Sequence, residues 1–102
     1  MDLKPGSRWK SAVCDVEVVL VRPPSSGEVL ECGGFAMVPH GGARLPDASP
    51  GPGLDGGSQA GKRYTEADTG MELLCTKTGQ GTLGLDGRPV TLKDAKKLPS
   101  SD

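Results

Sequence analysis

The sequence predicts an all-β domain: a small antiparallel sandwich or open barrel of two meanders, interrupted by a long flexible loop. Its 102 residues correspond to a single domain. Sixteen Gly and nine Pro are about twice the usual share of these residues, so long helices are not expected. Short segments rich in β-branched residues, with apolar and polar positions in alternation, are typical of strands.

Residues 12–21 show the strongest strand pattern in the chain. They contain neither Gly nor Pro, and apolar side chains occupy every second position from Cys14 to Leu20. We expect one continuous strand, half exposed at its start and buried on both faces at its end. Pro23 and Pro24 end this strand, because proline cannot donate a hydrogen bond to a neighbouring strand.

Two shorter strands complete the first meander. They are expected over residues 28–32 and 35–38, which are separated by Gly33 and Gly34. A glycine pair within a strand pattern suits a bulge or a tight bend, so the chain is expected to fold back at this point.

Residues 40–61 have a different composition and are predicted to form a flexible loop. This segment holds seven Gly and three Pro in 22 residues, with few apolar side chains. It buries too little apolar surface to offset the entropy that is lost on ordering. We therefore expect it to interrupt the domain without contributing to the core.

The second meander is predicted after this loop. Residues 71–77 alternate between two faces, and residues 82–85 and 90–92 flank an Asp-Gly pair at 86–87. Asp-Gly between two strand patterns is a strong signal for a two-residue hairpin turn. The last residues, 98–102, are expected to be a frayed C-terminus.

Charge and hydropathy exclude several classes of partner. Twelve Lys and Arg nearly balance thirteen Asp and Glu, giving a net charge of -1. We expect no binding to nucleic acid, since no basic run attracts a polyanion. No apolar stretch is long enough to span a membrane, and the first residues lack the apolar region of a signal peptide, so we expect a soluble, cytoplasmic protein.

Residues 79–84 read Gly-x-Gly-x-x-Gly, the spacing of a dinucleotide-binding loop. That motif needs a helix directly after it, because the helix N-terminus binds the pyrophosphate. The Gly and Pro that follow within residues 87–89 exclude a helix here. We interpret the glycines as turn residues and expect no nucleotide.

Three cysteines, Cys14, Cys32 and Cys75, are the main candidates for chemistry. An odd number cannot pair completely in disulfides, and in a reducing compartment we expect all three to be thiols. Together with His40 they supply a Cys₃His ligand set for zinc, and thiols also bind iron. In the alternative that we favour, the cysteines are small apolar core residues and no cofactor is bound, since no two of them stand at zinc-knuckle spacing.

A small cysteine-dependent enzyme is a further alternative. It requires His40, the one histidine of the chain, to activate one of the cysteines. The paired acids Asp15 with Glu17 and Glu66 with Asp68 fit a solvated strand face better than an acid and base pair. We favour a protein without catalysis, because a domain of this size rarely encloses a catalytic pocket.

The size of the core suggests how the protein acts. About 70 residues remain outside the loop and the chain ends, and a domain this small is marginally stable without a metal or a second subunit. We therefore expect a small cytoplasmic accessory or protein-interaction module without chemistry of its own. It would present a sheet face or edge to a partner protein or to a second copy of itself.

Overall fold

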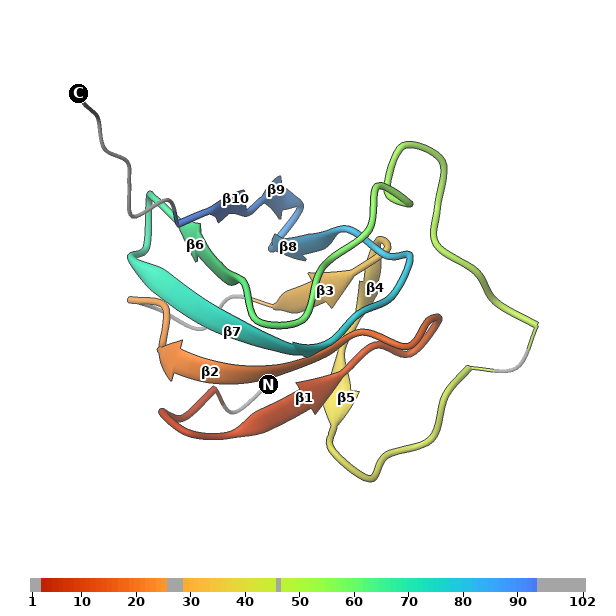
Figure 1. Ribbon diagram of the computed structural model, residues 1–102, viewed down its shortest axis with the longest axis horizontal. Helices are drawn as coiled ribbons and strands as arrows, with labels where there is room; N and C mark the ends of the chain where they lie inside the picture. The colour runs from red at the N-terminus through yellow and green to blue at the C-terminus, as the bar shows by residue number, and fades with distance from the viewer. Residues whose placement is uncertain (1–2, 26–28, 46, 94–102) are drawn as a thin grey trace.

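The computed structural model describes residues 3–25, 29–45 and 47–93; residues 98–102, predicted to be frayed, lie outside this part of the chain. The described regular structure is all β-strand, in two antiparallel sheets packed face to face (Figure 1). The predicted all-β sandwich is confirmed. Among the described residues, no helix has the length and apolar character needed to cross a bilayer.

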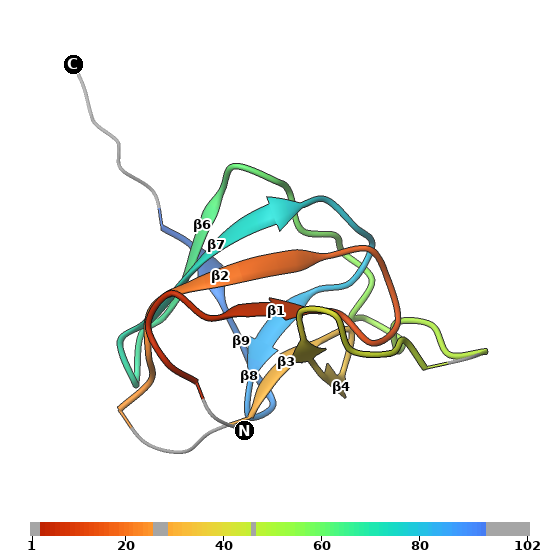
Figure 2. The ribbon, with the colours of Figure 1, turned by 90° about the horizontal axis from the view of Figure 1, so that it is seen from below.

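Ten short strands are described. In chain order they are β1 (Arg8–Lys10), β2 (Glu17–Arg22), β3 (Leu30–Cys32), β4 (Phe35–Ala36), β5 (Val38–Pro39), β6 (Arg63–Glu66), β7 (Met71–Lys77), β8 (Leu83–Leu85), β9 (Arg88–Pro89) and β10 (Thr91–Leu92). The larger sheet has the order β10-β6-β7-β2-β1-β5 and the smaller sheet has the order β4-β3-β8-β9. Figure 2 shows β7, β2 and β1 side by side in one layer and β8 and β3 in the other.

Strands from the two halves of the chain pair with each other. At the centre of the larger sheet β2 pairs with β7, and in the smaller sheet β3 pairs with β8. The two halves therefore share both sheets, where the sequence predicts one meander in each half. β2 and β7 are the longest strands, with six and seven residues, and a central position gives both of them a partner on either side.

The strand predicted over residues 12–21 is only partly present, because β2 begins after a tight turn that spans residues 11–16. Ser11 Oγ accepts hydrogen bonds from the backbone N–H groups of Val13 and Cys14, both at 3.1 Å. A serine side chain that bonds the backbone two and three residues ahead competes with strand pairing. The result is that Cys14 lies on a turn.

The chain crosses between the two sheets four times, and at two of these crossings, the corners, a single residue separates a strand of one sheet from a strand of the other. It passes from β4 to β5 through Met37, whose N–H donates to Leu30 O at 2.9 Å. It passes from β9 to β10 through Val90. The four strands at these corners are two residues long, and Pro39 and Pro89 in two of them lack an N–H donor. The sandwich therefore approaches a closed barrel and offers little free edge.

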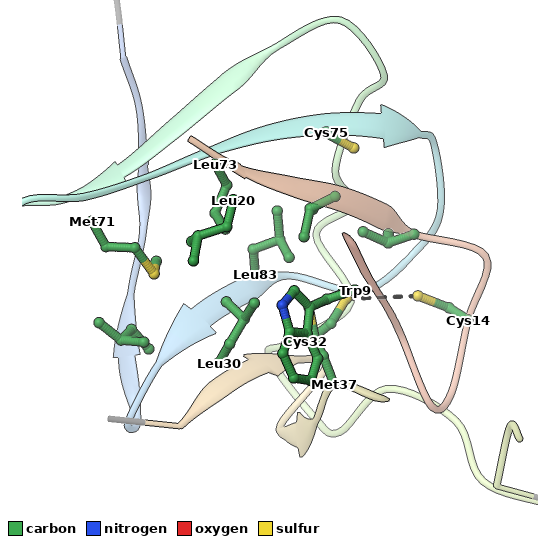
Figure 3. Packing of buried hydrophobic residues seen from close by; sticks show 13 residues of the cluster. Trp9, Cys14, Leu20, Leu30, Cys32, Met37, Met71, Leu73, Cys75 and Leu83 are labelled. Carbon is green, nitrogen blue, oxygen red and sulfur yellow. Dashed lines mark hydrogen bonds between the residues drawn. The ribbon is translucent and has the colours of Figure 1, made fainter. Parts of the chain in front are cut away.

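The core lies between the two sheets. The buried cluster comprises Trp9, Cys14, Val16, Val18, Leu20, Leu30, Cys32, Met37, Met71, Leu73, Cys75, Leu83 and Leu85 (Figure 3). Inward-facing residues of the two central strands, Val18 and Leu20 on β2 and Leu73 and Cys75 on β7, are at most 1% exposed. Removing these side chains from water is the main favourable contribution to folding.

The predicted hairpin is confirmed. Asp86 and Gly87 have positive φ angles of 52° and 81°, as both central residues of a type I′ turn require. The turn joins β8 to β9 and sets Leu85 opposite Arg88.

The described residues of the segment 40–61 contain no strand, but they contact the body of the protein at several points. Leu45 N donates to Ala12 O at 2.7 Å. Ser58 forms an isolated β-bridge with Gly79 and is 2% exposed. The flexibility of this segment stays a prediction, whereas its end at Ser58 is part of the packed body.

Candidate functional site

Cys14 and Cys32 come together in the core (Figure 3). Cys14 lies on the turn between β1 and β2, and Cys32 ends β3 in the other sheet. Their sulfur atoms are 3.8 Å apart, although the residues are 18 positions apart in the sequence. The structure thus brings two members of the predicted ligand set into contact.

The other two members, Cys75 and His40, have different partners. Cys75, on β7, is buried, and its thiol donates to the backbone carbonyl of Lys77 at 3.3 Å. His40 follows β5, with its Nε2 atom 3.6 Å from Glu17 Oε1. In the described part of the chain, no three or more His, Cys, Asp and Glu side chains form a group that could hold a metal ion. A metal site with all four ligands stays a prediction.

Cys14 has hydrogen-bond partners that stabilise a thiolate. Gly81 N donates to its sulfur at 3.3 Å, and Ser11 Oγ lies 3.2 Å from the same sulfur. Burial by itself raises the pKa of Cys14. Hydrogen bonds from Ser11, from two backbone N–H groups and from Cys32 outweigh burial, so this pKa lies below its ordinary value.

The other two thiols, Cys32 and Cys75, have raised pKa values and so lose their protons less readily than Cys14. Burial, and then the charge on Cys14, raise the pKa of Cys32 to about 12. Burial also raises the pKa of Cys75. When the pair ionises, the negative charge therefore lies on Cys14 and the proton stays on Cys32.

A small polar pocket of about 100 Å³ reaches Cys14, which is 6% exposed. Three cationic side chains, Lys10, Arg44 and Lys77, line the pocket together with two carboxylates. The pocket gives a small solute a route to Cys14.

Gly79 and Gly81, which the sequence indicates only as turn residues, pack against the cysteine pair and its turn. A Cβ on Gly81 would lie 2.6 Å from Cys32 Sγ and 3.0 Å from Cys14 Sγ, and a Cβ on Gly79 would lie 2.6 Å from Val16 N. Only glycine fits at these positions without a shift of its neighbours. The sequence carries no signal that links these glycines to cysteines so distant in the chain.

The predicted acid pairs have structural partners. Glu66 accepts hydrogen bonds from Asp68 N, Thr69 N and Thr69 Oγ1 at 3.0, 3.1 and 2.8 Å. Burial opposes its ionisation, but these bonds and the charge of Arg88 outweigh burial and lower the pKa of Glu66. Glu66 therefore caps the turn between β6 and β7. Asp15 pairs with Arg44 at 3.0 Å.

The outer face of the larger sheet carries an aliphatic strip between arginines. Arg8 on β1 lies opposite Val19 on β2, Val19 lies opposite Leu74 on β7, and Leu74 lies opposite Arg63 on β6. These residues point outward, because their neighbours along each strand are buried or packed against the core. Val21, further along β2, is 42% exposed. We call Arg8, Val19, Val21, Leu74 and Arg63 the outer strip.

Glu72 lies on the same face and forms ion pairs with two cations. Lys93 Nζ donates to its Oε1 at 2.8 Å and Arg63 donates to its Oε2 at 3.2 Å. The hydrogen bond from Lys93 outweighs burial and, with the charges of both cations, lowers the pKa of Glu72. Among the described residues of this face and its ion pairs, the cations outnumber the carboxylates: Arg8, Lys10, Arg22, Arg63 and Lys93 against Glu17 and Glu72. The face is therefore net cationic.

A groove of about 310 Å³ lies over the smaller sheet, where Gly84 on β8 has no side chain. Leu54, 38% exposed, lines it from the loop, and Arg88 and Pro89 line it from β9. A Cβ on Gly84 would lie 3.1 Å from Arg88 O, so a larger residue at this position would crowd the backbone of β9. The groove offers room for a small apolar group.

Two features of the described structure thus have the chemistry of a functional site. One is the thiol pair with its polar pocket, which suits soft-metal binding or thiol oxidation. The other is the cationic face with its aliphatic strip, which suits contact with a protein. Comparison with protein-family models, with curated proteins and with solved structures finds no match to this chain.

Proposed function

We propose that the chain is a small protein-interaction module without catalytic chemistry of its own, which binds an acidic partner protein through the outer strip. The observation that carries this proposal is the row of Arg8, Val19, Leu74 and Arg63 across four hydrogen-bonded strands. Paired strands hold such a row in a fixed arrangement, so little order has to be gained on binding.

The composition of the outer strip supports a protein partner. Protein interfaces combine an apolar centre with a polar rim, and arginine is enriched in them. Here Val19 and Leu74 are adjacent on paired strands, and Arg8 and Arg63 flank them. Arginine binds carboxylates in a bidentate manner, which favours a partner with acidic residues around an aliphatic contact.

The sheet face is better suited to binding than the sheet edges. The edge strands β5, β10, β4 and β9 have two residues each, which is too short for an added strand to form a useful ladder. Pro39 and Pro89 also remove N–H donors from two of these edges. Of the two modes predicted, face and edge, we therefore propose the face.

Charge favours a different protein over a second copy on this face. A two-fold contact between two outer strips would bring arginines of one copy near arginines of the other. Like charges that face each other in an interface cost several kcal/mol. We also propose that the module acts in the cytoplasm, where thiols stay reduced.

A photo-crosslinking residue at Thr76 tests the proposal. Thr76 is exposed on β7, two positions after Leu74. We expect it to capture one acidic protein in cells, and the same residue at the exposed Asp55 in the loop to capture none. The purified partner should then bind about tenfold more weakly to Arg8→Glu, equivalent to about 1.4 kcal/mol, and its affinity should fall with added salt.

Val21→Ser and Leu54→Ser provide a matched pair. The two side chains are similarly exposed, at 42% and 38%, but only Val21 belongs to the outer strip. Val21→Ser should weaken binding and Leu54→Ser should not. Crosslinks only to a second copy of the chain, or equal effects of the two serine variants, would contradict the proposal.

A zinc- or iron-binding protein is the second candidate, and one observation favours it. Two thiolates on one tetrahedral zinc ion with bonds of about 2.3 Å have sulfurs about 3.8 Å apart, which matches the separation of Cys14 and Cys32. Mass spectrometry under native and denaturing conditions, after addition of zinc or ferrous ion, measures the bound metal. Stoichiometric metal that Cys14→Ser and Cys32→Ser abolish supports this candidate. His40→Ala and Cys75→Ser then show whether those residues supply ligands.

A further inference from the structure

We propose that Cys14 and Cys32 form a reversible disulfide when the protein meets a hydroperoxide, with Cys14 as the attacking thiol. This inference is independent of the outer strip. It rests on the distance between the sulfurs, on the surroundings of Cys14 and on the pocket that reaches it.

The two sulfurs are neighbours but not bonded, so a disulfide requires that they move closer together. A disulfide needs a sulfur separation of about 2.05 Å, and the thiols stand 3.8 Å apart. Gly81, beside both sulfurs, has no side chain to obstruct the movement. Cys14 lies on a turn, whose backbone adjusts more readily than that of a paired strand.

The surroundings distinguish the two thiols. Cys14 receives a hydrogen bond from Gly81 N at 3.3 Å and lines the pocket that contains Lys10, Arg44 and Lys77. Hydrogen bonds from backbone N–H groups stabilise a thiolate, the form that attacks. Cys32 is 0% exposed and does not line this pocket. This arrangement assigns the first step to Cys14 and the second to Cys32.

The two steps balance without a further reactant. In the first, the Cys14 sulfur attacks one oxygen of the hydroperoxide, the O–O bond breaks, and the products are a sulfenic acid and an alcohol, or water when the oxidant is hydrogen peroxide. In the second, the Cys32 sulfur attacks the Cys14 sulfur, the S–O bond breaks, and water leaves with the Cys32 proton. A dithiol reductant reverses the change by thiol–disulfide exchange.

The bond would link the two sheets. Cys14 belongs to the turn of the larger sheet and Cys32 belongs to β3 of the smaller sheet. A covalent link between them restricts the unfolded chain, so the oxidised protein should unfold at a higher denaturant concentration than the reduced protein.

The test uses the full chain, reduced and treated with a chelator, then exposed to hydrogen peroxide. Remaining thiols are alkylated, and the protein is cleaved after glutamate. Cleavage at Glu17, Glu31 and Glu72 places the three cysteines on separate peptides. We expect the Cys14 and Cys32 peptides to be joined in the wild-type protein, with Cys75 alkylated.

Three variants refine the result. Cys32→Ala should stop at a sulfenic acid on Cys14, seen as the mass of one added oxygen. Cys14→Ala should slow the oxidation of Cys32 at least about tenfold, because the buried thiol lacks its attacking neighbour. Cys75→Ala is the matched control, since it removes a buried thiol outside the pair, and it should leave the joined peptides unchanged.

Other outcomes would overturn the proposal. A linked peptide that includes Cys75, or a disulfide only between two chains, would show that the pair does not react within the fold. Equal oxidation of all three cysteines, or sulfenic acid on Cys14 that never proceeds to the disulfide in the wild-type protein, would do the same. The wild-type peptide map needs no substitution, so the test stands even where a variant fails to fold.

Discussion

Gly81 lies directly against Cys32, so that a Cβ at position 81 would stand 2.6 Å from the cysteine sulfur. The two residues are far apart in sequence and belong to different segments of the smaller sheet and its adjoining turn. Their contact is part of the reason that the two sulfurs of Cys14 and Cys32 fit within one small region. Gly81 has no positive φ, so its close packing, and not its backbone conformation, requires glycine at this position.

Gly81→Ala should therefore destabilise the protein. The added methyl group overpacks the site, and overpacking typically costs about 1 to 3 kcal/mol. Urea unfolding followed by tryptophan fluorescence of the buried Trp9 measures the change. Gly51→Ala is the control, because a Cβ there meets its nearest neighbour at an ordinary 3.5 Å. Equal stability of the two variants would argue against the contact.

Gly87→Val should destabilise the hairpin through the backbone alone. Gly87 has a φ of 81°, and a Cβ at this position would meet no atom within 4 Å. A β-branched residue resists positive φ by about 1 to 2 kcal/mol. Gly87→Asn, which tolerates this conformation, should retain most of the stability. An unchanged melting temperature for Gly87→Val would contradict the type I′ turn.

Ser58→Ala should destabilise the protein more than the same substitution at an exposed serine. Ser58 Oγ donates to Gly81 O at 2.8 Å and is buried. Its loss leaves that acceptor without this donor, at a cost of about 1 to 3 kcal/mol. The exposed Ser25 provides the control, and Ser25→Ala should change the midpoint of unfolding very little.

Cysteine substitutions separate core packing from metal binding. If Cys75 is a core residue, Cys75→Ala should cost about 1 kcal/mol for the small cavity. Cys75→Ser should cost more, because it adds a polar group to an apolar site, and a chelator should change nothing. Under the metal alternative, both variants should cost several kcal/mol and the chelator should reproduce their effect.

Stability should fall in acid because of Glu66 and Glu72. Both have a lowered pKa in the folded protein, so they bind protons more weakly when folded than when unfolded. Their contribution is fully present above the ordinary glutamate pKa of 4.5 and is lost as the pH falls through the lower folded values. Urea midpoints measured across this range test the sign. Glu72→Gln should show a shallower pH dependence.

The sequence predicts the parts of the fold that depend on local patterns. The strand at 71–77 and the turn at Asp86-Gly87 follow from alternation and from turn chemistry. The residues before β2 have the same alternation, but Ser11 bonds the backbone of the next residues and forms a turn. Apolar alternation alone does not reveal this competition.

Long-range pairing is not visible in one sequence. The sequence predicts each half as its own meander, whereas β2 pairs with β7. Of the four predicted site residues, only Cys14 and Cys32 meet. Cys32 is 0% exposed although two glycines follow it. The loop packs against the first of them, where Gly51 N donates to Gly33 O at 2.9 Å.

The pairing of β2 with β7 also determines when this chain can fold during its synthesis. As the nascent chain leaves the ribosome, β2 and β3 emerge long before their partners β7 and β8. Until then, the side chains of Val18, Leu20 and Leu30 have no sheet to pack against, and the first half exposes apolar strand segments to chaperones. Such distant pairing slows folding, because a long loop must close before the contacts form. These sheets are therefore expected to form only after β7 and β8 have emerged.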